Sequence, residues 1–169
     1  MKRYLYPIVI MAAVMSAFCL VSCSKADETD EEGIFRQKPV SGDVRDFFNL
    51  LFPSEIRQSL YDLESDEDTI VRVVNSLEEF QAHYLGEVAI PDINFDDYTL
   101  VCGRVLMPMG PFYVKYMELN DDVSSSHLIL HTYHDNLTFQ LAYHMYFWGL
   151  FPKKPYNIIS VDVIKEYPS

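Results

Sequence analysis

Three histidines in the second half of the chain are the residues whose type and spacing most suggest chemistry. His127, His131 and His134 follow one another at intervals of four and three residues, which on an α-helix would place three imidazoles on one face. Imidazole nitrogens are common zinc ligands, so a helix here would predict a metal site. The segment LILHTY, residues 128–133, favours a strand instead, because it is rich in β-branched and aromatic residues.

A strand separates these imidazoles too widely to share a metal ion. Residues four apart lie roughly 13 Å from each other along a strand, and His134 points to the face opposite His127 and His131. The chain also has no G-x-S-x-G and no H-E-x-x-H motif, and Cys102 lies in the apolar run YTLVCGRVLM, as expected of a buried, inert thiol. We therefore predict no metal, no cofactor and no catalytic residue, and hence that the protein is not an enzyme.

The thiol of Cys23 is the best candidate for covalent modification. Residues 1–22 have the layout of a secretory signal, with Lys2 and Arg3 before an apolar core that ends at Val21. The sequence LVSC, residues 20–23, resembles the bacterial lipobox, in which the chain is cut before a lipid-modified cysteine. This pattern predicts a lipoprotein signal peptide over residues 1–22 and a membrane anchor on Cys23; a plain signal peptide with an incidental cysteine is the alternative.

An acidic stretch follows the anchor. The sequence DETDEE, residues 27–32, cannot bury its carboxylates, so we expect an extended, flexible tether over residues 23–42. Acids placed directly after a lipidated cysteine resemble the export signal of surface lipoproteins in Bacteroides-like bacteria. The expected location is the outer membrane or cell surface of a Gram-negative bacterium, and a charged spacer on an inward-facing lipoprotein is the alternative.

Composition narrows the range of partners. The net charge is −12, and removal of residues 1–22 takes away Lys2 and Arg3 but no acid, which leaves −14. Nucleic-acid binding requires clustered Lys and Arg to neutralise phosphates, and the chain has no such cluster. We therefore expect no nucleic-acid partner.

Residues 43–169 carry the patterns of a single globular domain. Val44, Phe47, Phe48 and Leu51 form one helical stripe that Pro53 ends, and a second short helix is expected after Ser54. A strand at TIVRVVN, residues 69–75, leads into the capping box SLEE, residues 76–79, of a further helix. From Tyr98 the chain alternates strand-like runs with short turns. Short turns favour antiparallel neighbours, so we predict an α+β domain with a five- or six-stranded, mostly antiparallel sheet and helices on one face.

The order of these elements resembles one known family. Over about residues 69–120 the chain resembles the C-terminal-domain family of protease complex subunit PrcB. The resemblance rests on the order of a strand, then NSLEEFQAHY, then PDINFDDYTLVCGRV. Members of that family pair a capped helix with a strand whose entry reads DF-x-x-Y-t-l, matched here by residues 92–100, and carry a glycine-rich, tyrosine-containing turn after it, matched in part by residues 109–113. The resemblance implies a secreted or lipid-anchored, non-catalytic partner of a protease.

A hairpin is predicted at the turn HDNL, residues 134–137. Asp135 and Asn136 tolerate the positive φ angles of a two-residue loop, which would place His127 opposite His144, with Cβ atoms roughly 5 Å apart. Alternation along TFQLAYHMYFW, residues 138–148, assigns Phe139, Leu141, Tyr143, Met145 and Phe147 to the core face. The opposite sheet face would then carry a strip of polar and aromatic side chains. The strip comprises His127, His131, His144, Tyr146 and Trp148. A sheet face covered by the N-terminal helices is the alternative.

Two functions fit these observations, and an enzyme is the remaining alternative, which a metal bound to the purified protein would support. The first is a lipid-anchored interaction module that binds or stabilises a protein partner through the strip, with a protease as one candidate. The second is a carbohydrate-binding accessory lipoprotein, in which Tyr146 and Trp148 stack on sugar rings.

Overall fold

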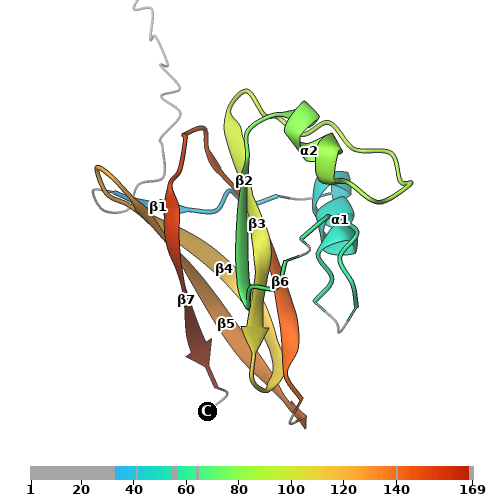
Figure 1. Cartoon of the computed structure of the whole chain (residues 1–169), viewed down its shortest axis with the longest axis vertical. Coiled ribbons are helices and arrows are strands. Elements are labelled where there is room, and N and C mark those ends of the chain that lie inside the picture. Colours follow the sequence, from blue (N-terminus) through green and yellow to red (C-terminus); the bar gives the residue numbers. More distant parts are fainter. Residues whose placement is uncertain (1–32, 41, 55–56, 64, 140, 168–169) are drawn as a thin grey trace, which may run out of the picture.

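The computed structural model describes residues 33–40, 42–54, 57–63, 65–139 and 141–167. Seven strands and two helices occur in this part of the chain (Figure 1). In order they are β1 (Ile34–Arg36), α1 (Gly42–Leu51), β2 (Thr69–Val74), α2 (Leu77–His83), β3 (Tyr98–Met107), β4 (Gly110–Asp121), β5 (Ser126–Phe139), β6 (Tyr143–Pro152) and β7 (Ile158–Glu166).

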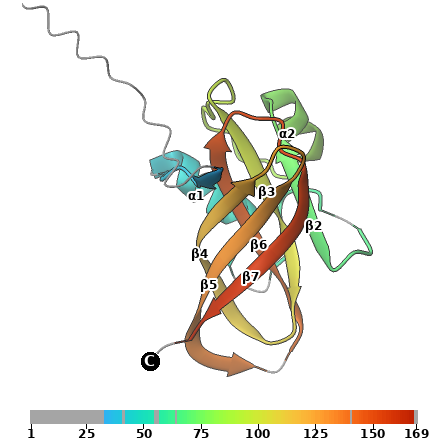
Figure 2. The same ribbon diagram turned by 90° about the vertical axis from the view of Figure 1, so that its left-hand side faces the viewer.

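The strands form two sheets, so the predicted α+β class is correct but the prediction of one sheet with five or six strands is wrong. One sheet has the order β1-β4-β5-β7 and the other has the order β2-β3-β6. Every pairing is antiparallel except that of β5 with β7. The chain changes sheets at the short turn between β3 and β4, and it changes back between β5 and β6. The two sheets curve around a common interior (Figure 2).

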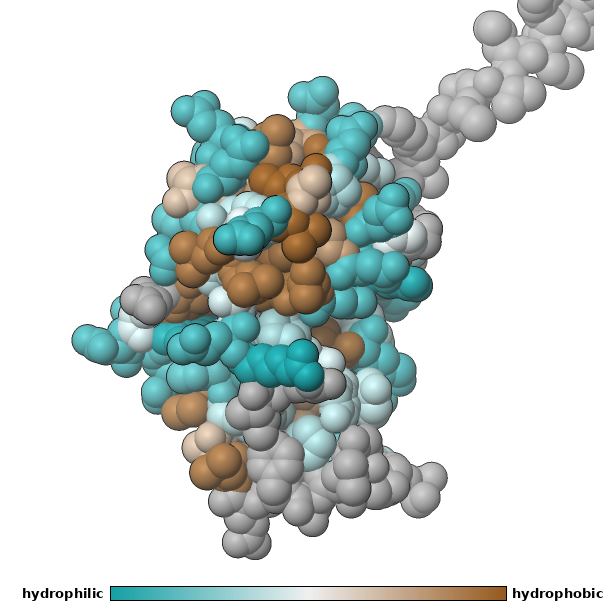
Figure 3. All heavy atoms as spheres, turned by 90° about the vertical axis from the view of Figure 1, so that its right-hand side faces the viewer, coloured by the Kyte–Doolittle hydropathy of each residue, from teal (hydrophilic) through white to brown (hydrophobic). Residues whose placement is uncertain are grey.

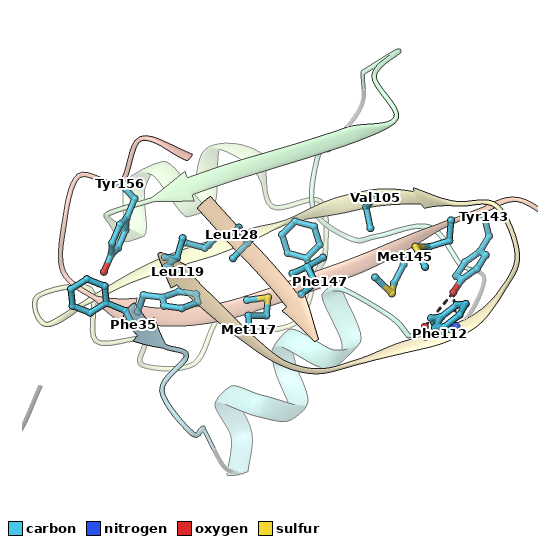
Figure 4. Close-up of a cluster of buried hydrophobic side chains, with 14 residues drawn as sticks. Phe35, Val105, Phe112, Met117, Leu119, Leu128, Tyr143, Met145, Phe147 and Tyr156 are labelled. Carbon is cyan, nitrogen blue, oxygen red and sulfur yellow. Dashed lines mark hydrogen bonds between the residues drawn. The ribbon is translucent and has the colours of Figure 1, made fainter. Parts of the chain in front are cut away.

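Apolar side chains from both sheets meet in the space between them (Figure 4). Tyr143, Met145 and Phe147 of β6 alternate into this core, as their period of two predicts, and meet Met117 of β4. Leu141, which the same alternation assigns to the core, is 60% exposed because β6 begins two residues after it.

Both helices pack on the opposite face of the β2-β3-β6 sheet, as predicted (Figure 1). The stripe of α1 buries Phe47, Phe48 and Leu51 against this face. The capping serine of α2, Ser76, accepts a hydrogen bond from the Glu79 N–H at 3.1 Å, as the capping box predicts. The described residues after Ser54, 57–63, contain no helix, in contrast to our expectation.

Two further predictions are wrong. The tether predicted for residues 23–42 includes Ile34–Arg36, which pair with β4 as β1, and Gly42, at which α1 begins. The predicted HDNL turn is part of β5, which continues to Phe139, opposite Gly110 of β4. Cys23 and the acidic residues 27–32 lie outside the described residues. No helix in the described part of the chain is both long and apolar enough to cross a membrane.

Candidate functional site

The residues of the predicted strip lie in two different sheets. His127 is opposite Asn120 of β4 and Ser160 of β7, whereas His144 is opposite Leu106 of β3. The predicted pairing of His127 with His144 is therefore wrong, because β5 and β6 do not form a hairpin. The strip separates into a histidine pair on β5 and a group of three residues on β6.

The two β5 histidines occupy the face of the β1-β4-β5-β7 sheet that points away from the core. His131 stacks on Tyr116 with 4.1 Å between ring centroids, and its Nε2 lies 3.1 Å from a Glu118 carboxylate oxygen. His127 Nδ1 lies 2.7 Å from the Ser160 hydroxyl. Each imidazole thus has one ring nitrogen engaged within the sheet.

Two of the three β6 residues, Tyr146 and Trp148, lie beneath the helix layer, where the predicted alternative of a covered face applies. His144 lies nearer the start of β6, opposite Leu106 of β3. Trp148 stacks on Phe48 of α1 with ring centroids 4.7 Å apart, and its Nε1–H donates to Asn49 Oδ1 at 3.2 Å. Tyr146 packs against the same cluster. Burial lowers the pKa of His144, and the nearby Arg104 charge lowers it further, while Asp68 partly opposes the shift.

Tyr146 and Trp148 nevertheless line a cavity of about 310 Å³, which we name the β4–β6 slot. It lies between the edge of β4 and the edge of β6, with α1 along one side. Its lining includes residues 113–115 of β4, residues 146–148 of β6, Arg45 and Asn49 of α1, and Gln37 and Lys38. The volume is within the range of small ligand sites.

The segment that follows β1 closes one end of the slot. The Gln37 N–H donates to the Met117 carbonyl of β4 at 3.1 Å, and the Lys38 N–H donates to the Leu150 carbonyl of β6 at 2.7 Å. The two sheets come close here because Gly149 has no side chain: a Cβ at this position would lie 2.5 Å from Met117 Cε. Two residues thus bridge the two sheets.

Tyr143 links β6 to β4 beyond the other end of the slot (Figure 4). Its hydroxyl accepts a hydrogen bond from the Phe112 N–H at 2.7 Å and donates to the Phe112 carbonyl oxygen at 3.2 Å. A side chain of β6 thereby takes the place of a neighbouring strand on β4. The Tyr143 ring needs Gly110, where a Cβ would lie 2.3 Å from the ring.

Backbone polar groups of both strands face the slot between these ends. The backbone N–H and C=O of Phe112 point away from β5, towards Tyr143. Backbone groups two residues apart on a strand point the same way, so the N–H and C=O of Val114 also point away from β5. On β6, the Leu150 carbonyl points away from β3, so Trp148 and Tyr146 also direct their backbone groups to the slot. In the described part of the chain, no strand pairs with the slot-facing backbone groups of Val114, Tyr146 and Trp148.

The slot differs in charge from the chain as a whole. The net charge is −12, yet the described lining residues include Lys38, Arg45 and Lys115 and no acid. The Lys115 ammonium lies 2.9 Å from a Glu166 carboxylate oxygen, and this contact raises the pKa of Lys115. Lys38 and Arg45 are the cations on the slot side, and the Arg45 guanidinium lies 3.4 Å from a carboxylate oxygen of the neighbouring, exposed Asp46. Gln37 Oε1 is buried there and has no hydrogen-bond donor among the described residues.

Other surface features offer less defined chemistry. A cavity of about 600 Å³ is lined by Asn75, Asp96 and Lys153, but the Lys153 ammonium is already bonded to the carbonyls of Asn75 and Phe95. Apolar side chains gather on the helix side of the molecule (Figure 3). Leu77 of α2 and Leu85, two residues after its end, are exposed. No group of three or more potential metal ligands occurs among the described residues.

Sequence reasoning identified Tyr146 and Trp148 but missed Lys38, Arg45 and the β4 edge. Lys38 was placed in the tether, and Arg45 lies on the polar side of α1, where nothing local distinguishes it. Pro39 was the usable signal, because proline ends strand pairing directly after a short β-like run.

Comparisons of the chain with protein-family models, with curated proteins and with solved structures gave no match.

Proposed function

We propose that this chain is a lipid-anchored, non-enzymatic interaction module of the cell envelope, displayed at the surface, that binds a protein partner through the β4–β6 slot. The anchor is the lipid expected on Cys23. The resemblance to the PrcB C-terminal-domain family favours a protease as that partner. The slot replaces the predicted strip as the contact site, and it keeps two residues of that strip.

The observation that supports this proposal most is the slot's mixture of chemical groups. Aromatic area from Trp148 and Tyr146, cations from Lys38 and Arg45, and backbone hydrogen-bonding groups all border one concave site. Aromatic and arginine side chains in concave sites dominate the energetics of protein interfaces.

Carbohydrate binding is the weaker alternative. Sugar stacking needs an open aromatic face, and one face of Trp148 is occupied by Phe48 at 4.7 Å. The slot's hydrogen-bonding groups also include backbone edges, which suit another backbone better than a sugar ring.

Photo-crosslinking in intact cells tests the proposal. A photoreactive amino acid at Ser54, an exposed residue of the slot lining, should give one protein adduct. The matched control is Ile164, which is 44% exposed on β7 and should give no such adduct. Strand β5 separates β7 from β4 in the β1-β4-β5-β7 sheet. Identical adduct patterns at the two positions, or none at either, would contradict a partner at the slot. An adduct removed by glycosidases and not by proteases would support the carbohydrate alternative.

A further inference from the structure

The segment from Ile34 to Lys38 already shows how an extended chain fits between β4 and β6. Ile34–Arg36 pair with β4, and the next two N–H groups go to different sheets: Gln37 to Met117 of β4 and Lys38 to Leu150 of β6. Successive N–H groups of one strand thus reach both edges. Pro39 follows, and because it has no N–H and a fixed φ, the pairing stops there.

The direction of the two edges permits the same pairing to continue. Along β4 the chain runs from Phe112, at the Tyr143 end, to Met117, at the Lys38 end, and β6 runs from Tyr143 to Leu150. The two edges are therefore parallel to each other. A strand that enters the slot with the polarity of β1 is antiparallel to both, which is the more stable pairing.

We propose that the β4–β6 slot receives an extended segment of the partner protein as an added strand, which pairs with Val114 on one side and with Tyr146 and Trp148 on the other. This inference rests on the proposed function and specifies the partner's form. Between Phe112 and Met117, the β4 edge is long enough for about four residues at about 3.3 Å each. The added strand therefore belongs to a short, locally extended motif.

Charge specifies the chemistry of that motif. Lys38 and Arg45 border the slot and no acid does among the described lining residues, so a segment with carboxylate side chains is favoured. Proline is excluded from the paired positions, because each N–H of the segment has an acceptor edge on one side.

Selection from a library of random heptapeptides tests the inference with the full chain in detergent micelles. We expect the retained peptides to be rich in Asp and Glu and to lack internal proline. One retained peptide is then synthesised in two N-methylated forms, each blocking alternate N–H groups. Because the strand pairs on both edges, each form should bind at least about tenfold more weakly. Loss in only one form would show pairing with a single edge and would overturn the two-edge strand.

Charge variants and amide exchange locate the binding. Lys38→Glu and Arg45→Glu should each weaken binding about tenfold, whereas Lys165→Glu, a matched change on β7, should leave the affinity unchanged. The peptide should also slow hydrogen exchange at the Val114, Tyr146 and Trp148 amides. Unchanged exchange at these amides, or the absence of any retained peptide, would overturn the inference.

The two proposals fail differently. A protein adduct at Ser54 together with peptides that tolerate N-methylation would keep the binding function and reject the added strand. Peptides that lose binding on N-methylation, without any cellular adduct, would keep the strand pairing and reject the envelope partner.

Discussion

His144 shows how one residue's surroundings determine its chemistry. It is partly buried on β6 near Arg104, and both burial and that charge lower its pKa below the ordinary value of 6.5. The unfolded chain therefore binds a proton more readily than the folded chain as the pH falls below 6.5, and the contribution of His144 to stability, present above 6.5, is lost progressively.

We predict that His144→Gln reduces the acid sensitivity of the fold. When the pH is lowered from about 7.5 to about 5.5, the urea concentration at the unfolding midpoint should decrease in the parent. It should decrease less in the variant, because the titrating imidazole is absent. An equal fall in both proteins would show that protonation of His144 does not oppose folding.

Trp148 combines packing with a place on the slot. Trp148→Ala should lower the free energy of unfolding by about 2–3 kcal/mol, because the ring packs on Phe48 and is only partly buried. Trp148→Phe keeps a ring there and loses the bond to Asn49, so it should cost about 1 kcal/mol. Urea denaturation measures both values, and an unchanged midpoint for the alanine variant would show that the ring is not packed.

At the scale of elements, the period of the apolar residues predicted which side chains of a strand are buried, whereas the turn-forming residues did not predict where a strand ends. The alternation on β6 correctly predicted which face holds Tyr143, Met145 and Phe147. The residues Asp135-Asn136 favour a tight turn locally, but β5 continues through them and reaches Gly110, where distant pairing outweighs the local preference. Splitting of the strands into two sheets could not be predicted, because short β–β connections fit a hairpin and a change of sheet equally well.

Gly149 is the position where the sheets approach most tightly, so we predict that Gly149→Ala destabilises the protein by about 1–3 kcal/mol through overpacking against Met117. Thermal or urea unfolding measures this cost. The added methyl group should cost less in a Met117→Ala background, which removes the clashing Cε atom. Strict additivity of the two changes would indicate that Met117 is not the obstacle.

On the scale of the whole molecule, the location of the protein in the cell envelope remains a prediction from residues 1–32. Cys23→Ala should move the protein from the membrane fraction to the soluble envelope fraction, because the acyl chains are the expected anchor. Cell fractionation with immunodetection measures the shift. A Cys102→Ala variant is the matched control, since burial raises the pKa of that thiol and keeps it inert. Unchanged membrane retention of the Cys23 variant would reject the lipoprotein assignment.

The short stretch of chain between the expected anchor and β1 limits how far the slot can lie from the membrane. Ten Cα-to-Cα steps lead from Cys23 to Gly33, so the chain can span at most about 36 Å before β1 begins. The slot starts directly after β1, at Gln37 and Lys38. A lipid on Cys23 would therefore keep the slot close to the membrane, and a binding partner would have to present its segment within a few nanometres of the bilayer.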